Sequence, residues 1–235
     1  MSGPPGTTTA VFFDVDFTLI YPGPKFQGEG YEEFCRKHGM SVDPSAFHAA
    51  VLSASHLLDR AQDRVYNDQI FIDYTAHIIR QMGGRGPAVI ECASEIYREW
   101  AACQHFLLYD DVPAALKALA DRNLRIGLIS NSHRCLESFQ SHFDLDDLID
   151  VAISSSQHGY MKPHPSIFEA ALTLVGVPAS EAVMVGDSLS QDIEGARQVG
   201  MRGVLVRRSE SIEHQQADSG DVPVIRSLTE LVNYV

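Results

Sequence analysis

Two aspartates directly follow a short apolar run near the beginning of the chain. The run Val11-Phe12-Phe13 predicts a buried strand, and Asp14 and Asp16 stand where that strand should end. A carboxylate in such a place costs several kcal/mol unless it is paired or bound to a metal ion. In an open parallel sheet, ligands bind beyond the carboxyl ends of the strands. Asp14 and Asp16 are therefore the candidate reaction centre.

Polar residues also follow the apolar runs in the second half of the chain. If these runs form one parallel sheet, their carboxyl ends meet at the same edge, and the polar groups join the two aspartates there. The result would be a cluster of carboxylates with a hydroxyl group and one lysine. The residues gathered in this way are Ser130, Asn131, Lys162, Asp187 and Asp192.

This mixture suits phosphoryl transfer through a carboxylate nucleophile. Asp14 would attack phosphorus and form an aspartyl-phosphate. Asp16 would protonate the leaving oxygen and then deprotonate the water that cleaves the intermediate. Lys162 would offset charge on the phosphoryl oxygens, and Ser130, with nearby backbone N–H groups, would hold the same oxygens. Thr18 is placed to fix Asp16 or the turn, and we group it with the substrate-binding residues.

The approach of one anion to another requires a cation between them. Mg²⁺ prefers oxygen ligands and keeps several waters, so it is the expected cofactor. Asp14, the main-chain carbonyl of Asp16, and Asp187 could supply ligands. Asp192, five residues after Asp187, could be a further ligand or could hold Lys162.

The periodicity of apolar residues predicts the elements that would position these groups. Alternating strands and helices predict a parallel sheet covered on both faces, to which the first strand belongs although a helical segment separates it from its partners. That all-helical segment, over about residues 21–107, is typical of a cap or lid. The expected strands cover 10–15, 124–129, 149–153, 182–185, 203–206 and 222–225. The expected helices cover 29–38, 47–58, 71–82, 89–100, 112–119, 137–143, 168–175, 189–199 and a last one from 228.

Taken together, these motifs resemble those of the haloacid dehalogenase superfamily. Four motifs in the right order carry the resemblance: Asp14-Val-Asp16-Phe-Thr18-Leu, Ser130-Asn131, Lys162-Pro163 and Gly186-Asp187-xxxx-Asp192. The resemblance implies a Rossmann-like α/β core over residues 1–20 and 108–235, with an inserted helical cap over 21–107. It also implies that Asn131 binds substrate.

Three features of the sequence bear on which members of that superfamily it resembles. Phe17 stands where many members have glycine, and we expect its side chain to point away from the phosphate. Dehalogenases of the superfamily have a similar first motif that lacks the second aspartate, so the presence of Asp16 favours phosphoryl chemistry. Phosphonate hydrolysis calls for a lysine in the cap, but the predicted cap holds only Lys25 and Lys37, both near its start.

Composition limits the classes of partner. The chain of 235 residues carries 18 Lys and Arg against 31 Asp and Glu, a net charge of −13, which argues against a nucleic-acid or anionic-membrane surface. Its four cysteines include no CxxC pair, and we see neither a signal-peptide pattern nor a long apolar run. We therefore expect a cytoplasmic protein with reduced thiols, as a monomer or homodimer, acting on a small phosphorylated substrate.

The sequence thus predicts a Mg²⁺-dependent phosphohydrolase of small phosphorylated metabolites. One alternative is a phosphomutase, which passes the phosphoryl group of Asp14 back to substrate, because nothing in the motifs separates the two reactions. The other alternative is a binding or regulatory protein on the same fold. The identity of the substrate does not follow from the sequence, because cap loops follow no transferable code.

Overall fold

The computed structural model describes residues 7–54, 57–58, 64–208 and 220–235. The chain divides into two compact units, one made of Met1–Tyr21 with Leu108–Val235 and the other of Pro22–Leu107. It passes between them at the short strands β2 (Ile20–Pro22) and β3 (Phe106–Leu108), which pair with each other. We call the first unit the sheet unit and the second the helical unit.

The sheet unit is built on a six-stranded sheet with the order β5-β4-β1-β6-β7-β8, in which every neighbouring pair is parallel. This confirms the predicted α/β fold with a parallel sheet. The strands are β1 (Ala10–Phe13), β4 (Arg125–Ser130), β5 (Val151–Ser154), β6 (Ala182–Gly186), β7 (Arg202–Val206) and β8 (Val224–Ile225).

Strand β1 belongs to this sheet, as predicted, and lies between β4 and β6. Its residue Val11 is in register with Ile126 of β4 and Val183 of β6, and all four β1 residues are buried. A run of four apolar residues is what a strand covered on both faces requires. The strand ends at Phe13, two residues before the predicted end at Val15, because the chain then turns back on itself.

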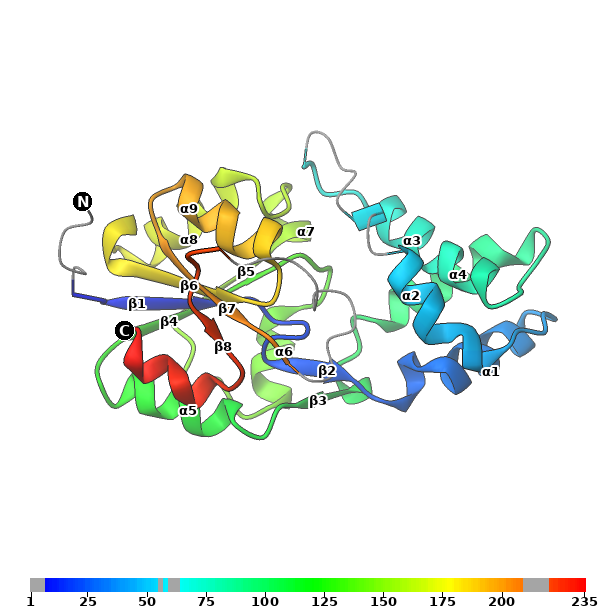
Figure 1. Cartoon of the computed structure of the whole chain (residues 1–235), viewed down its shortest axis with the longest axis horizontal. Coiled ribbons are helices and arrows are strands. Elements are labelled where there is room, and N and C mark those ends of the chain that lie inside the picture. The colour runs from blue at the N-terminus through cyan, green and yellow to red at the C-terminus, as the bar shows by residue number, and fades with distance from the viewer. Residues whose placement is uncertain (1–6, 55–56, 59–63, 209–219) are drawn as a thin grey trace. The chain divides into compact units, whose positions relative to one another are not determined.

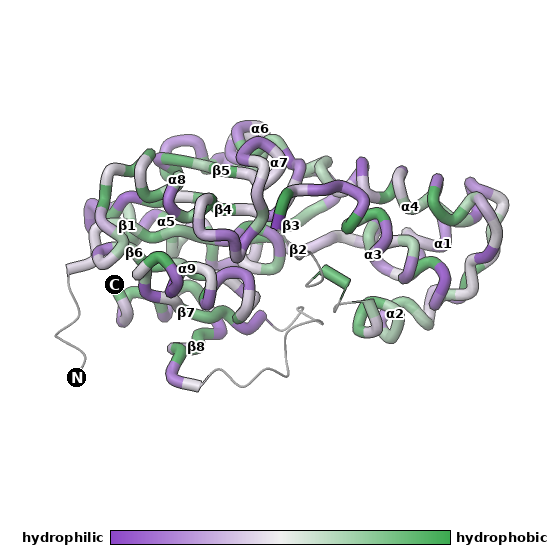
Figure 2. Tube along the Cα trace, turned by 90° about the horizontal axis from the view of Figure 1, so that it is seen from above, coloured by the Kyte–Doolittle hydropathy of each residue, from purple (hydrophilic) through white to green (hydrophobic). Residues whose placement is uncertain are grey.

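Helices cover both faces of the sheet (Figure 1). Helices α8 (Pro165–Val175) and α9 (Gly195–Gln198) lie on one face, and α5 (Val112–Ala120) lies on the other with the C-terminal 3₁₀-helix (Leu228–Asn233). Phe12, Ile129 and Met184 are buried in the core that includes residues of α8. Strand β5 and parts of other strands have hydrophobic colours in the trace, as do parts of helices such as α2 (Figure 2). Two shorter helices, α6 (Leu136–His142) and α7 (Ser155–His158), complete this unit.

The segment after β6 differs from its prediction. The expected helix over 189–199 is a π-helix over Leu189–Glu194 followed by α9. Small residues let it lie close to its neighbours. A Cβ atom on Gly203 of β7 would come within 2.5 Å of Ile193, and one on Gly195 would come within 2.8 Å of the Phe168 ring.

The helical unit contains four α-helices among the described residues. These are α1 (Gly28–Lys37), α2 (Phe47–Ala54), α3 (Asp68–Gln81) and α4 (Ala88–Glu99). Helix α3 begins three residues before its apolar pattern, because the Asn67 side chain accepts a hydrogen bond from the Gln69 N–H and caps it. Apolar faces of α3 and α4 are buried in this unit, including Ile79 and Ile96. No described helix has the length and hydropathy needed to cross a membrane.

Candidate active site

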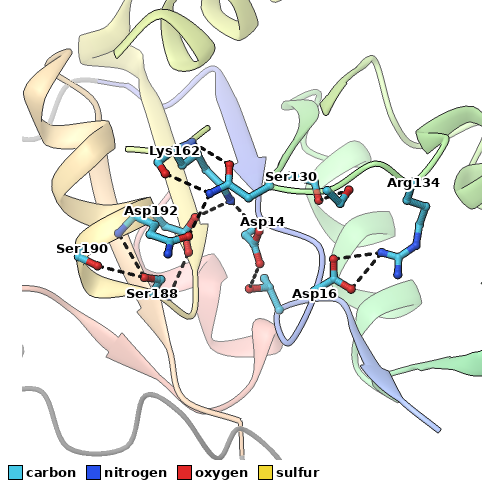
Figure 3. Close-up of polar contacts among 12 residues, drawn as sticks. Asp14, Asp16, Ser130, Arg134, Lys162, Ser188, Ser190 and Asp192 are labelled. Atoms are coloured by element: carbon cyan, nitrogen blue, oxygen red, sulfur yellow. Dashed lines mark hydrogen bonds and ion pairs between the residues drawn. The ribbon is translucent and has the colours of Figure 1, made fainter. Parts of the chain in front are cut away.

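Lys162 joins two carboxylates that come from distant parts of the sheet unit. Its Nζ lies 2.6 Å from Asp14 Oδ1 and 2.6 Å from Asp192 Oδ1 (Figure 3). The lysine side chain is 1% exposed. Burial lowers the pKa of Lys162, but the charges of Asp14 and Asp192 outweigh this, and the pKa lies above its ordinary value. The amine is therefore held as a cation between two carboxylates.

Asp14 follows β1 and is held by both of its carboxylate oxygens. Oδ1 accepts the hydrogen bond from Lys162, and Oδ2 accepts one from Thr18 Oγ1 at 3.1 Å. The Asp14 N–H donates to the carbonyl of Val185, which extends the ladder between β1 and β6 by one bond. Burial raises the pKa of Asp14 to about 7, while Lys162 acts in the lowering direction. A further cation near Asp14 would favour its ionised form.

Asp192 reaches the site because the π-helix lies against the end of β6. Its Oδ2 accepts a hydrogen bond from the Ser188 N–H at 3.0 Å, while its Oδ1 is used on Lys162. A Cβ atom on Gly186 would come within 2.3 Å of the Asp192 carboxylate. The absence of a side chain at Gly186 therefore lets Asp192 approach the lysine.

Asn131 supports the main chain of the lysine loop. Its Oδ1 accepts the Lys162 N–H at 2.7 Å, and its Nδ2 donates to the Lys162 carbonyl at 3.1 Å and to Gln191 Oε1 at 3.0 Å. Since an N–H and a carbonyl of the same residue face the two ends of the amide, the amide can be oriented in only one way. The amide therefore ties the end of β4 to both the lysine loop and the π-helix.

Three buried carboxylates offer atoms for a metal ion. Oxygens of Asp14, Asp187 and Asp192 lie within 4.8 Å of one another. Lys162 offsets part of this charge, and Arg207, whose Nη1 donates to the Asp187 carbonyl, adds a less buried cation. An all-oxygen set with an excess of negative charge is the kind of site that a divalent cation such as Mg²⁺ takes. The residues present therefore fit the expected metal.

Asp16 points in another direction from Asp14. Its two oxygens lie 3.0 and 3.1 Å from Nη1 of Arg134, and Figure 3 shows its carboxylate turned toward that residue. Asp16 lies outside the group of three carboxylates, so its expected part in metal binding rests on its main-chain carbonyl alone. Its backbone bridges to Ile20, and Phe17 between them has a φ of 63°, in the left-handed region that favours glycine. This conformation accounts for the glycine that many members of the superfamily have there.

The remaining expected residues lie at the same edge of the sheet and make contacts within the protein. The Thr18 hydroxyl is used on Asp14, where we expected it to fix Asp16 or the turn. The Ser130 hydroxyl is buried and donates to Ser132 Oγ at 2.9 Å. The expected roles of Thr18, Ser130 and Asn131 in substrate binding stay predictions.

The model of the haloacid dehalogenase-like hydrolase family matches residues 8–200, which contain the whole set of candidate residues. The chain belongs to this family of hydrolases. The predicted family resemblance is thereby confirmed, and the motif order that suggested it corresponds to one site in space.

Relatives in this hydrolase family match over most of their length. A haloacid dehalogenase-like hydrolase domain-containing protein 3 from Danio rerio is 29% identical over 94% of this chain and 93% of its own. A glyceraldehyde 3-phosphate phosphatase from Pyrococcus abyssi is 30% identical over 83% of this chain and 79% of its own. The crystal structure of a HAD phosphatase from Thermococcus onnurineus has 28% identity and a TM-score of 0.63, with 97% of both chains covered.

Two arginines of this hydrolase site do not appear among the residues expected from sequence. Arg134 pairs with Asp16, and Arg208 donates to the Thr18 carbonyl at 2.9 Å and to Asp111 Oδ2 at 2.8 Å. Two signals point to them. Each of the two arginines follows the end of a sheet strand within a few residues. In addition, four aspartates beside a single lysine leave an excess of negative charge that other cations must reduce.

Proposed function

We propose that this hydrolase is a Mg²⁺-dependent phosphatase that acts on a small phosphorylated metabolite through an aspartyl-phosphate on Asp14. The observation that carries the proposal is the position of Lys162, 2.6 Å from both Asp14 and Asp192, with the Asp187 carboxylate beside them. The proposed nucleophile, a buried cation and a group of oxygen ligands for a metal ion therefore lie close together. Phosphatases among the relatives of 25–30% identity support the same class of reaction.

The proposed reaction has two displacements at phosphorus. In the first, an Asp14 oxygen forms a bond to phosphorus while the bond to the leaving oxygen breaks, and Asp16 gives that oxygen a proton. In the second, water attacks phosphorus, Asp16 takes its proton, and the bond to Asp14 breaks. The products are the alcohol and inorganic phosphate, and both aspartates return to their starting states. Throughout, Lys162 keeps the Asp14 carboxylate oriented and offsets charge on the phosphoryl oxygens.

The metal ion would be held by Asp14 and Asp187, with the Asp16 carbonyl. When bound, Mg²⁺ would supply positive charge that allows an anionic nucleophile to approach an anionic phosphoryl group. Asp192 uses one carboxylate oxygen on Lys162 and the other on the Ser188 N–H. These contacts favour a role in holding the lysine over a role as a metal ligand.

The substrate is proposed to be small. Two of the relatives are named as phosphatases of glyceraldehyde 3-phosphate and ribulose 1,5-bisphosphate, both of which are small sugar phosphates. We propose further that the helical unit, Pro22–Leu107, acts as the cap that selects the substrate and limits access of water.

Phosphate release from a panel of phosphorylated metabolites, with Mg²⁺ and with EDTA, tests the proposal. We expect turnover with Mg²⁺, and loss of at least about a thousandfold in Asp14→Asn, since the nucleophile is removed. Asp121→Asn, at an exposed aspartate paired with Lys117, is the matched control and should keep full activity. Wild-type protein without turnover, or unchanged turnover in Asp14→Asn, would refute the mechanism. Transfer of the phosphoryl group back to a sugar phosphate would instead indicate the phosphomutase.

A further inference from the structure

The ion pair between Asp16 and Arg134 is largely buried. The Arg134 side chain is 0% exposed and the Asp16 side chain is 19% exposed. A guanidinium group loses its hydration when it is buried, and only a well-placed anion compensates for that loss. Arg134 comes from the loop that follows β4, so the pair joins the loops after two neighbouring strands.

The backbone around Asp16 is held in place without Arg134. The Phe17 N–H donates to the Ile20 carbonyl at 2.7 Å, and the Leu19 N–H donates to the Val15 carbonyl at 2.9 Å. Arg208 fixes the Thr18 carbonyl from the end of β7. These bonds fix the Cα position of Asp16, but they do not determine the direction of its side chain.

The direction of the side chain matters because the two aspartates have different proposed tasks. Asp14 is held toward Lys162 and Thr18, whereas Asp16 is held toward Arg134 (Figure 3). A group that carries a proton to a leaving oxygen acts only within hydrogen-bond reach, and a misplacement of about 1 Å can cost about a hundredfold in rate. A freely rotating Asp16 would also be drawn toward the cations around Asp14.

We propose that Arg134 is a positioning residue that fixes the Asp16 carboxylate for proton transfer to the leaving oxygen. This rests on the proposed phosphatase function and adds to it the residue that controls the acid. Because its side chain is 0% exposed, Arg134 would act through Asp16 and not on the substrate directly. Its influence therefore depends on how much the leaving group needs a proton.

Two substrates with different leaving groups test the proposal. Glycerol 3-phosphate releases an alkoxide that needs a proton, whereas p-nitrophenyl phosphate releases a stable phenolate. With Mg²⁺ and enzyme in excess over substrate, we expect Arg134→Met to lower the rate of leaving-group release in the first turnover about ten- to a hundredfold for glycerol 3-phosphate. For p-nitrophenyl phosphate we expect a loss of less than about threefold in the same first-turnover rate, because this displacement needs no acid. The first turnover is measured because Asp16 also serves the water attack that follows with both substrates.

Two further variants separate positioning from folding. Arg134→Lys keeps the positive charge and should recover part of the lost first-turnover rate, and it decides the question if Arg134→Met does not fold. Arg125→Met removes another arginine paired with an aspartate, on the exposed end of β4, and should leave both activities unchanged. Equal losses of the first-turnover rate for the two substrates, no loss for either, or a gain in that rate would overturn the proposal.

A double variant shows whether Arg134 acts through Asp16. In an Asp16→Asn background, we expect Arg134→Met to cause no further loss with glycerol 3-phosphate, because the group it positions is already inactive. Multiplying losses would overturn the proposal. Wild-type protein without Asp14-dependent turnover would refute the phosphatase function and this inference with it. Asp14-dependent turnover that is insensitive to Arg134 would refute this inference alone.

Discussion

Lys162 stands at the meeting point of the charged side chains, and its two contacts serve different purposes. The contact with Asp14 orients the proposed nucleophile, and the contact with Asp192 holds the lysine itself. Attraction between charges is strong in a buried site, but so is the cost of leaving any one of them without its partner. The lysine is therefore needed for the stability of this edge of the sheet as well as for its chemistry.

Replacement of Lys162 with methionine should destabilise the metal-free protein by about 3–5 kcal/mol, because two buried carboxylates lose their cation. Urea unfolding in EDTA at neutral pH measures the change. Lys117→Met is the matched control: this lysine is 69% exposed and pairs with Asp121, so we expect a change below about 0.5 kcal/mol. Equal effects of the two substitutions would contradict the role assigned to Lys162.

Part of the geometry of the candidate site was predictable from the ends of strands. Asp14 and Asp187 directly follow β1 and β6, and the structure brings Lys162 and Asp192 beside Asp14. The roles of these residues in the reaction stay predictions. The sequence places Arg134 shortly after a strand, but it does not show that this arginine pairs with Asp16. Sequence patterns give the end of a strand, but they do not give the direction in which a long side chain crosses from one loop to another.

At the scale of elements, the π-helix after β6 explains how Asp192 comes within reach of the lysine. It lies close to the sheet because its neighbour Gly186 carries no side chain. The helical periodicity of residues 189–199 was predicted correctly, but its first part has a wider turn than an α-helix. Periodicity over six residues cannot distinguish the two forms, and packing against Gly186 and Gly203 decides between them.

Gly186→Ala tests this packing. The added methyl group would meet the Asp192 carboxylate, and we expect a loss of stability of about 1–3 kcal/mol with reduced phosphatase activity. Without a clash, alanine is favoured over glycine inside a strand by roughly 0.5–1 kcal/mol. A loss of stability in the variant therefore identifies the clash. Thermal unfolding and phosphate release measure the two effects. A stabilised, fully active variant would contradict this account of Gly186.

A second network joins the loop before α5 to the C-terminal 3₁₀-helix. Asp111 Oδ2 accepts hydrogen bonds from Arg208 Nη1 at 2.8 Å, Ser227 Oγ at 2.7 Å and the Leu228 N–H at 2.7 Å. Burial acts to raise the pKa of Asp111, but the bonds from Arg208 and Ser227 outweigh it and leave the pKa below 3.8. The ionised form is therefore favoured by folding.

The stability that Asp111 contributes should depend on pH. Because its folded pKa is lowered, the contribution is fully present above about 3.8 and is lost as pH falls through the folded pKa. We expect Asp111→Asn to cost about 1.5 kcal/mol at pH 7 and progressively less toward pH 3. Urea unfolding across this range measures the difference, with the exposed Asp121→Asn as control. A difference that does not change with pH would contradict the ionic role.

For the whole molecule, the carboxylate cluster should link metal binding to folding. At Mg²⁺ about a hundred times its Kd, the folded state should gain about 2.7 kcal/mol, and Asp187→Asn should remove most of this gain. Unfolding in MgCl₂ against EDTA measures it, and KCl of equal ionic strength controls for screening. If Asp187→Asn keeps the whole response to Mg²⁺, the metal binds elsewhere.

The central place of β1 also affects how the protein is made. Lys162 and Asp14 are 148 residues apart, and β1 pairs with β4 and β6. During synthesis, an apolar strand that ends in two carboxylates leaves the ribosome long before anything it can pair with. Asp14, the proposed nucleophile, is thus translated 148 residues before Lys162, and Asp192, which holds the lysine, follows after 30 more. We expect nascent chains to be inactive, and exposed to aggregation through β1, until Asp192 has emerged.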